Sequence, residues 1–361
     1  MKNTAQVIIV GGGLSGLTLA YLLSKKQIKF SLIEASERLG GRIQTHKGIM
    51  NTPLELGATW FSDMHPNLLS LIKELGLQKY PQFSKGISLF QTNSFEPPQE
   101  FSVPQGDPPS YRLAGGTQML TDTLIQKTLF ESIHLNSSVS GIKDLGNVLE
   151  VGVSDGKKHY GKQVFLCLPP QLVAHGITFS PELPQVLCQI MPEVQTWMAG
   201  SIKFVLEYAS PFWREKGFSG MLYSHTGIIS EMYDHTNFEQ NKFGFTGFLN
   251  AGANSYAQEL RKELVLGQLK DLLGEESSIP LAYLDKVWTD KFISGGNQLI
   301  PRAHQNNGHP IFNQGYMGDK LFFGATETST QSPGYMEGAV ISARNNYRLA
   351  INRLGKEIKI S

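Results

Sequence analysis

The order of apolar and polar positions predicts alternating strands and helices over most of the chain. The continuous apolar run Val7–Val10 is followed by a glycine-rich turn and then by apolar residues at helical spacing between Leu17 and Leu23. A short apolar run that ends in glycine indicates a buried strand, and the helical spacing indicates a helix that packs on a sheet. A second buried strand is expected at 29–33. This pattern predicts an α/β fold with a doubly wound, Rossmann-like sheet.

The remaining elements follow from the same spacing rules. Apolar residues at helical spacing predict helices, and short runs rich in β-branched or aromatic residues predict strands. The expected helices are 66–77, 117–129, 258–273 and 335–354, and the expected strands are 133–135, 141–145, 148–153, 164–168, 194–208, 243–250 and 320–324. In contrast, residues 80–112 contain six prolines between short alternating runs, which indicates short antiparallel strands and loops.

Because the proline content and the apolar pattern of 80–112 differ from those of the flanking residues, the chain divides into two kinds of segment. At 361 residues the chain is long enough for two domains. We expect a dinucleotide-binding domain assembled from three segments, 1–80, 113–192 and 291–361. A smaller, mixed α+β substrate domain is expected from 81–112 and 193–290.

Composition excludes several classes of partner. The net charge is +1 and no long basic run occurs, so neither nucleic acid nor an anionic membrane surface is an expected partner. No run of 18 apolar residues occurs, so no membrane span is expected. Cys167 lies within an apolar run, and Cys188 is not at a C-x-x-C or zinc spacing from it. We therefore expect a cytoplasmic protein with no metal site.

The turn after the first strand has the spacing of a dinucleotide site. Gly11, Gly13 and Gly16 form a G-x-G-x-x-G sequence between a strand and a helix. The first glycine allows the tight turn, the second lets a pyrophosphate approach the backbone, and the third lets the helix pack closely on the strand. The free N–H groups and the positive end of the helix dipole then face the phosphates. Taken alone, the hexad is also typical of an ordinary strand-to-helix turn.

Two neighbouring features favour the dinucleotide site over that alternative. Glu34 ends the second strand, 18 residues after Gly16, where an acid can accept hydrogen bonds from an adenosine ribose. A second glycine turn follows at Arg38–Arg42, and its two guanidinium groups can meet the same diphosphate. Together the two turns and the acid predict a bound dinucleotide.

The segment 322–340 is the second informative stretch. Its pattern predicts a strand, a turn and then a helix that begins near Gly334. A helix N-terminus can present N–H groups to a partly anionic ring edge, and Glu327 can accept hydrogen bonds from hydroxyl groups. The alternative is a C-terminal helix that only packs on a sheet, which the paired glycines and the acid disfavour.

These motifs together resemble the flavin-containing amine oxidases of the monoamine oxidase type. The similarity extends over nearly the whole chain, and its most specific part is G-x-T-E-T from Gly324 with G-Y-M-E-G-A from Gly334. The resemblance implies an FAD-dependent oxidoreductase whose dinucleotide domain is an FAD-binding domain. It further implies that a small-molecule amine is oxidised at its C–N bond to an imine, while O2 is reduced to H2O2.

The resemblance also assigns residues to the cofactor. The matching positions for the ADP part are Gly11, Gly13, Ser15, Gly16, Glu34, Ala35, Gly41 and Arg42. A loop near the flavin matches Gly57, Ala58, Thr59 and Trp60, and the adenine contact matches the backbone of Val139. In the C-terminal motif, Glu327 would take the ribityl side and Met336 the pyrimidine edge, with Gly324, Gly334 and Ala339 completing the motif.

Three residues have implied roles in the chemistry. Lys203 matches the lysine that holds a water at flavin N5, although a lysine on a strand is otherwise typical of a solvated face. As a cation it would stabilise negative charge that develops as electrons pass to oxygen. Trp288 and Tyr335 match aromatic side chains beside the flavin ring, and each would otherwise be an ordinary core aromatic.

The sequence departs from the family pattern in three places. Asn297 stands where mammalian-type members carry a flavin-linked cysteine, so noncovalent FAD is expected. Gln298 stands where the family often places a second tyrosine that guides the amine. The segment between Ala58 and Gly115 is much shorter than usual, which predicts a reduced substrate domain with a more open cavity or one completed by a partner.

Several alternatives stay open at this level. His304 and His309 lie five residues apart in a loop and are interpreted as solvated or structural, not as metal ligands. The same fold can serve an FAD-dependent dehydrogenase, a desaturase or an NAD(P)H-oxidising enzyme, because fold does not determine function. A flavin-binding protein without turnover is a further alternative. The oligomeric state is left open.

Overall fold

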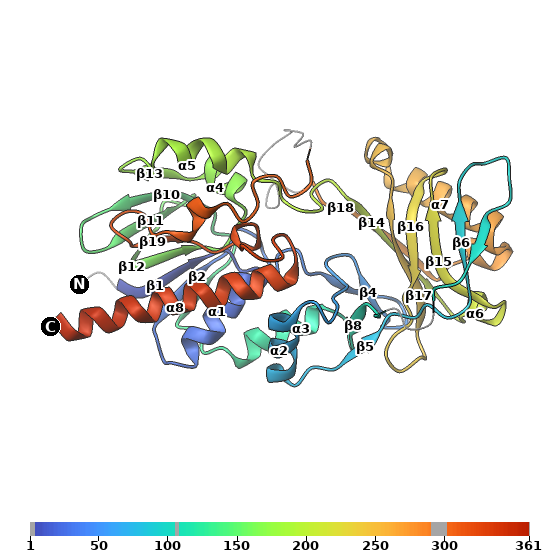
Figure 1. Ribbon diagram of the computed structural model, residues 1–361, viewed down its shortest axis with the longest axis horizontal. Coiled ribbons are helices and arrows are strands. Elements are labelled where there is room, and N and C mark those ends of the chain that lie inside the picture. The colour runs from blue at the N-terminus through green and yellow to red at the C-terminus, as the bar shows by residue number, and fades with distance from the viewer. Residues whose placement is uncertain (1–3, 105–107, 290–301, 361) are drawn as a thin grey trace.

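Two large sheets joined by short strands and loops form the structure (Figure 1). The computed structural model describes residues 4–104, 108–289 and 302–360. A long C-terminal helix runs along the first sheet, and the second sheet stands apart from it with a helix on its far side (Figure 1).

The first sheet carries the N-terminal glycine turn. Its strands are β1 (Thr4–Val10), β2 (Phe30–Ile33), β9 (Ser132–His134), β10 (Val139–Asp144), β11 (Leu149–Val153), β12 (Lys158–Leu166), β13 (Thr178–Ser180) and β19 (Leu321–Phe323). Their order is β13-β10-β11-β12-β1-β2-β9, with β19 beside the end of β12. The strands β19, β12, β1, β2 and β9 pair in parallel, whereas β10 and β11 form an antiparallel hairpin at one side.

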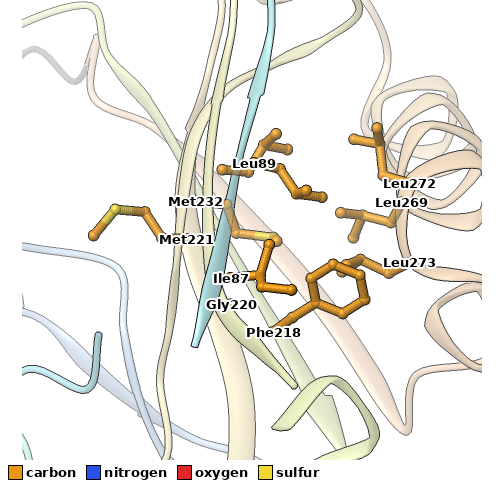
Figure 2. A pocket seen from close by; sticks show the side chains of 10 residues that line it. Ile87, Leu89, Phe218, Gly220, Met221, Met232, Leu269, Leu272 and Leu273 are labelled. Atoms are coloured by element: carbon orange, nitrogen blue, oxygen red, sulfur yellow. The ribbon is translucent and has the colours of Figure 1, made fainter. Parts of the chain in front are cut away.

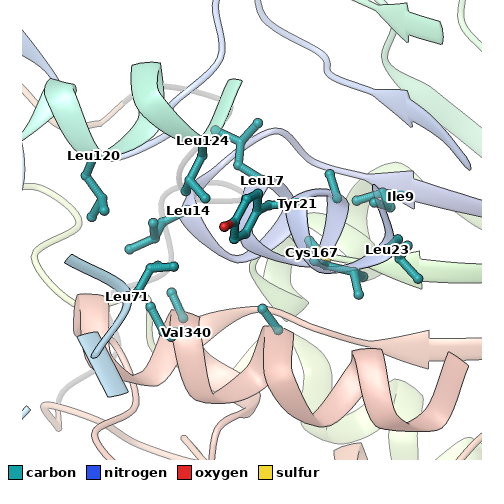
Figure 3. Packing of buried hydrophobic residues seen from close by; sticks show 14 of the residues in the cluster. Ile9, Leu14, Leu17, Tyr21, Leu23, Leu71, Leu120, Leu124, Cys167 and Val340 are labelled. Atoms are coloured by element: carbon teal, nitrogen blue, oxygen red, sulfur yellow. The ribbon is translucent and has the colours of Figure 1, made fainter. Parts of the chain in front are cut away.

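Helices cover both faces of this sheet. One face carries α1 (Leu14–Ser24), α2 (Pro66–Leu75), α3 (Gln118–Lys127) and α8 (Met336–Ile360), and the other carries α4 (Pro170–Gly176) and α5 (Gln185–Ile190). Alternate side chains of β1 enter the two apolar clusters, with Ile9 on the α1 side and Ile8 on the other. Leu17 and Tyr21 of α1 lie between the sheet and the neighbouring helices (Figure 3). Burial on both faces explains the continuous apolar run of β1.

The second sheet is mostly antiparallel. In spatial order its strands are β18 (Ala282–Val287), β14 (Ile202–Tyr208), β17 (Phe243–Leu249), β16 (Ile229–Asp234), β15 (Phe218–Ser224), β6 (Ile87–Gln91) and β7 (Gln99–Phe101). Helix α7 (Gln258–Leu273) covers one face, where Leu89 and Met232 point toward Leu269 around a small apolar pocket (Figure 2). Met221 of β15 points the opposite way (Figure 2).

That opposite face is turned toward the first sheet. Short elements lie between the two sheets and around them: β3 (Thr45–Lys47), β4 (Pro53–Glu55), β5 (Lys79–Pro81), β8 (Tyr111–Leu113), α6 (Phe212–Glu215) and 3₁₀ turns at Met191–Glu193, Ala251–Ser255, Glu275–Ser278, Pro310–Asn313 and Thr326–Thr328. Val205 of β14 packs on Leu54 and Leu56, and the Thr246 hydroxyl of β17 donates to the Glu55 carbonyl at 3.2 Å. The second sheet therefore rests on β4 and the loop that follows it.

Most expected elements are confirmed within a few residues, but two expectations are wrong. The strand expected at 194–208 begins only at Ile202, because Met198 and Gly200 have φ angles of +62° and +85°, which no strand allows. Within 80–112, β6 pairs in parallel with β15, so this segment is not purely antiparallel. The strands β15, β16 and β18 were not predicted, because polar side chains such as Ser219, Glu231 and Asp285 interrupt their apolar alternation.

Gly16 allows α1 to lie directly against the glycine turn. A Cβ atom at Gly16 would overlap the carbonyl oxygen of Gly11, which belongs to the rigid backbone of the turn. Gly267, in the middle of α7, offers a contrast because a Cβ atom there would meet nothing within 4 Å.

We expect Gly16→Ala to destabilise the protein by about 1–3 kcal/mol, since the added methyl forces α1 away from β1. Gly267→Ala is the matched control and should be neutral or stabilising by up to about 1 kcal/mol, because alanine favours the helix. Chemical unfolding followed by circular dichroism measures both. Equal stability of the two variants would contradict the close packing of α1.

Candidate functional site

The two glycine turns lie against each other at the N-terminus of α1. Gly13 precedes the helix, and no side chain caps it. The Gly40 N–H donates to the Gly12 carbonyl at 2.8 Å, which fixes the second turn on the first. A Cβ atom at Gly13 would meet only the Gly41 Cα, at 3.9 Å. The backbone here is therefore open to a phosphate, and uncapped N–H groups at a helix start suit that anion.

The acid after β2 is held by the same turn. Glu34 accepts hydrogen bonds from the Gly12 N–H at 2.6 Å and from the Ser36 N–H at 2.8 Å. These bonds orient the carboxylate, and each oxygen keeps a further lone pair for a ribose hydroxyl. Val139, expected beside the adenine, lies buried in the apolar cluster that contains Ile33, the residue before Glu34.

Ser15 and Gly324 join α1 to the strand β19. The Ser15 hydroxyl donates to the Gly324 carbonyl, so this side chain fastens the helix to the C-terminal motif. Gly324 has no room for a side chain, because a Cβ atom would overlap the Asn346 amide of α8. Further along α8, Ala339 and Met336 belong to the apolar cluster around α1. The predicted cofactor residues at the two ends of the chain thus lie together.

A buried carboxylate without a hydrogen bond lies beside the two turns. Glu327 is 0% exposed, and neither of its carboxylate oxygens has a hydrogen-bond partner in the described part of the chain. Its nearest cation is Arg42, whose Nη1 lies 2.6 Å from Oε1 without hydrogen-bond geometry. A buried charged group without hydrogen bonds is costly unless a ligand supplies them. The pair therefore fits a polyhydroxylated group such as the ribityl chain of a flavin.

Lys203 is buried where the second sheet meets the loop after β4. Its side chain is 2% exposed, and Nζ donates to the Gly57 carbonyl at 2.7 Å and to the Thr59 hydroxyl. The ammonium lies 4.8 Å from the centre of the Trp60 ring. An ammonium has three donors, so one remains for a ligand or a water. This burial excludes the alternative in which Lys203 lies on a solvated face of a strand.

Burial changes the protonation of this site. Desolvation lowers the pKa of Lys203 to about 7, and the Glu55 carboxylate opposes that shift. Desolvation also raises the pKa of Glu55, which accepts hydrogen bonds from the Thr45 hydroxyl and the Thr117 N–H. Lys203 can therefore gain or lose a proton near neutral pH, as a group that assists proton or electron transfer must.

Trp288 and Trp60 flank the same loop. The Trp288 indole N–H donates to the Leu56 carbonyl at 2.7 Å, and this side chain is buried at the end of β18. Trp60 donates to the Gln82 side chain at 2.8 Å and lies 5.0 Å from Tyr233, edge to face. The loop is therefore in contact with two tryptophans, of which Trp60 lies beside Lys203 and Trp288 is bonded to the residue before Gly57.

Tyr335 lies in a separate aromatic cluster that includes one of the two histidines. Its ring is 41% exposed and lies 5.7 Å from His304, nearly parallel, and 6.0 Å from Trp197. The Trp197 and His304 rings stack at 4.3 Å. The structural interpretation of His309 agrees with its Nδ1, which accepts from the Ile311 N–H. His304, in contrast, is half-buried against a predicted catalytic residue and is not a solvated loop side chain.

Two of the three departures from the family pattern, Asn297 and Gln298, lie outside the described residues. In the described ranges, no group of three or more His, Cys, Asp and Glu side chains has the arrangement of a metal site. The structure describes every other predicted site residue. Those that meet between the two sheets come from both glycine turns, the loop after β4 and the C-terminal motif.

Comparisons with known proteins agree with this geometry. A family model for flavin containing amine oxidoreductases matches residues 14–96 and 89–346. The chain belongs to this family. A probable flavin-containing monoamine oxidase A of Dictyostelium discoideum is 24% identical over an alignment of 470 positions, gaps included, that covers 99% of this chain and 98% of that protein.

Solved structures share the fold. A variant of putrescine oxidase superposes with a TM-score of 0.83 at 20% identity, over 98% of this chain and 100% of that one. Cyclohexylamine oxidase from Brevibacterium oxydans IH-35A superposes with a TM-score of 0.83 at 18% identity, over the same shares of the two chains. The family and these folds confirm the predicted resemblance, the α/β fold and a flavin-dependent oxidoreductase of the amine oxidase kind. None of the described helices combines the length and apolarity that a membrane span needs.

Sequence reasoning missed several residues of the site. Trp197 and His304 lie beside Tyr335, and Glu55 and Arg112 are buried with charges near Lys203. Glu55 precedes the predicted loop by two residues, so an acid next to a glycine motif was a usable signal. The aromatic pair had no local signal, because its members are over 100 residues apart in the chain.

We expect Glu327→Gln to weaken FAD binding by more than it changes the melting temperature of the cofactor-free protein. The neutral amide removes a buried charge that lacks hydrogen bonds, which offsets part of the cost of leaving Arg42 without its ion-pair partner, but it weakens acceptance from ligand hydroxyls. Gel filtration followed by the flavin-to-protein absorbance ratio measures retention. The exposed Glu276→Gln serves as the control, and equal retention in both variants would contradict the assignment.

Proposed function

We propose that the protein is an FAD-dependent amine oxidase that passes electrons to O2 and releases H2O2. The observation that carries this proposal is the fully buried Lys203, held between the Gly57 carbonyl and Thr59 with one donor left over. The Glu327 carboxylate, buried without hydrogen bonds, supports FAD as the cofactor. The putrescine, cyclohexylamine and monoamine oxidases to which the chain is similar favour an amine as the substrate.

The residues that would hold FAD start at the two glycine turns, where the backbone is open to a phosphate. The diphosphate would lie at Gly11, Gly13, Gly16 and Gly41, the adenosine at Glu34, Ala35 and Val139, and the ribityl chain at Glu327 and Arg42, with Met336, Gly334 and Ala339 at the pyrimidine edge. We propose noncovalent attachment, because the position of the flavin-linked cysteine is occupied by Asn297, which offers no thiolate.

A bound flavin would supply the redox chemistry, namely acceptance of a hydride equivalent from the α-carbon of the amine and delivery of the two electrons to O2. The chain orients and protects this chemistry. Lys203 offers its third N–H to a water and, when charged, stabilises negative charge that develops nearby. Trp60 and Phe248 exclude water around the lysine, Trp288 holds the loop through the Leu56 carbonyl, and the exposed ring of Tyr335 would bound the place where the substrate nitrogen enters.

We also propose the domain boundaries expected from the sequence. The strands of the first sheet lie within 1–80, 113–192 and 291–361, and those of the second lie within 81–112 and 193–290. The cytoplasmic location stays a prediction from the sequence, and the oligomeric state stays open.

The rival function is an FAD-dependent dehydrogenase, desaturase or NAD(P)H oxidase on the same fold. We expect amines to bleach the flavin absorbance under anaerobic conditions and to yield H2O2 on aeration, with reduced nicotinamides as the matched negative donors. Bleaching by reduced nicotinamides or hydrocarbon donors alone, without peroxide, would favour the rival. Failure of every donor would favour a binding protein without turnover.

We expect Lys203→Met to slow reoxidation by O2 much more than reduction by substrate, because it removes the buried cation. Burial lowers the pKa of Lys203 to about 7, so the ammonium form is present below that pH and is lost above it. The wild-type reoxidation rate should therefore fall as pH rises through about 7, and the rate in the methionine variant should not. Stopped-flow measurement of both half-reactions from pH 6 to 9 tests this, and identical pH profiles would remove the assigned role.

A further inference from the structure

A continuous row of side chains crosses the second sheet on the face turned to the first sheet. Strand register places Lys203 opposite Phe248, Phe248 opposite Glu231, and Glu231 opposite Tyr223. Residues directly opposite each other on paired strands point to the same face. Figure 2 agrees, since Met221, two residues before Tyr223, points away from α7. The row therefore leads from the predicted flavin lysine across the substrate side of the sheet.

Glu231 is the carboxylate in this row. It is half-buried, and in the part of the chain that the structure describes its carboxylate accepts one hydrogen bond, from the Tyr233 hydroxyl, 2.6 Å from Oε2. Tyr233 in turn shares a hydrogen bond with Tyr223 at 3.0 Å and contacts Trp60. Within the described ranges, no lysine, arginine or histidine forms an ion pair with Glu231, and Oε1 accepts no hydrogen bond. Its negative charge is thus oriented by the tyrosines and raises the pKa of Lys203 from a distance, but no ion pair in the described residues neutralises it.

This charge lies at a defined distance from the reaction site. Glu231 is two strands from Lys203, which corresponds to about 10 Å at the usual strand spacing. Phe248 lies between them in the strand register, and the Trp60 ring packs against both Phe248 and Tyr233, so the surface that joins them is aromatic. An apolar substrate tail along this surface would desolvate an uncompensated carboxylate, which is unfavourable. A cationic tail would gain a charge-assisted hydrogen bond instead.

The outer end of the row opens to solvent. A hollow of about 350 Å³ is lined there by Phe90, Phe101 and Tyr223, with the Gln99 and Glu100 side chains at its edge. Aromatic walls attract cations through their ring faces. Tyr223 lines this hollow and shares a hydrogen bond with Tyr233, which donates to Glu231, so the hollow lies next to the tyrosine pair that holds the carboxylate.

We propose that Glu231 binds a second, distal ammonium group of the substrate, so that amines with two or more cationic nitrogens, spaced by several methylenes, are preferred over monoamines of equal length. This inference rests on the proposed amine oxidation. The reacting nitrogen then lies near the flavin lysine and Tyr335, while the distal nitrogen donates to the free oxygen of Glu231.

The test compares α,ω-diamines with monoamines of the same chain length, from four to eight carbons. The second-order rate constant of anaerobic flavin reduction is measured for each member of a pair. We expect the wild type to prefer the diamine by about 10- to 100-fold at its best length, the size of a hydrogen bond to a charged group. The ratio should fall to near one in Glu231→Gln. It should stay at the wild-type value in Glu263→Gln, which removes an exposed carboxylate from α7 on the other face of the sheet.

Each outcome decides between the two proposals. Equal rates with both amines in the wild type, or equal loss of both in Glu231→Gln, would overturn the distal site while leaving amine oxidation intact. No reduction by any amine would instead refute the proposed function. If Glu231→Gln does not fold, Glu231→Asp tests the same point, because its shorter side chain should move the preferred diamine to a greater length; an unchanged preference would contradict the proposal.

Discussion

The burial of one ammonium between the two sheets is the constraint on which the site depends. Lys203 extends from the second sheet to the Gly57 carbonyl and Thr59, in the loop that also contacts Arg42 of the glycine turns. A buried cation is tolerated only where oxygens surround it closely. The loop must therefore keep its shape, and a Cβ at Gly57 would already overlap the Arg42 carbonyl. The same contact aligns the cofactor side with the substrate side.

The remaining charges between the sheets are arranged in a similar way. Glu55 and Glu327 are both buried, and each has at least one carboxylate oxygen without a hydrogen bond. Such groups lower the stability of the chain by itself, because their desolvation is not repaid internally. Functional sites commonly hold this kind of unsatisfied polarity. The structure thus concentrates its electrostatic cost where a cofactor and a substrate can relieve it.

Much of the first sheet could be predicted because its signals are local. The strand, glycine turn and helix at Val7–Leu23 are specified by residues close together in the chain, and their predicted bounds agree with β1 and α1. The second sheet was harder, because polar side chains interrupt the apolar alternation of β15, β16 and β18. The strand prediction was wrong over 194–201, because two residues of this segment have left-handed φ angles.

The sequence by itself determined the two glycine turns, the C-terminal motif and the order of elements, since each follows from spacing within about 20 residues. Only the tertiary structure decided that Lys203 is buried, that Trp197 and His304 join Tyr335, and that Glu231 shares a row with Lys203. These facts depend on strand register and on contacts between distant segments, and a register slip of one residue would turn the row to the other face.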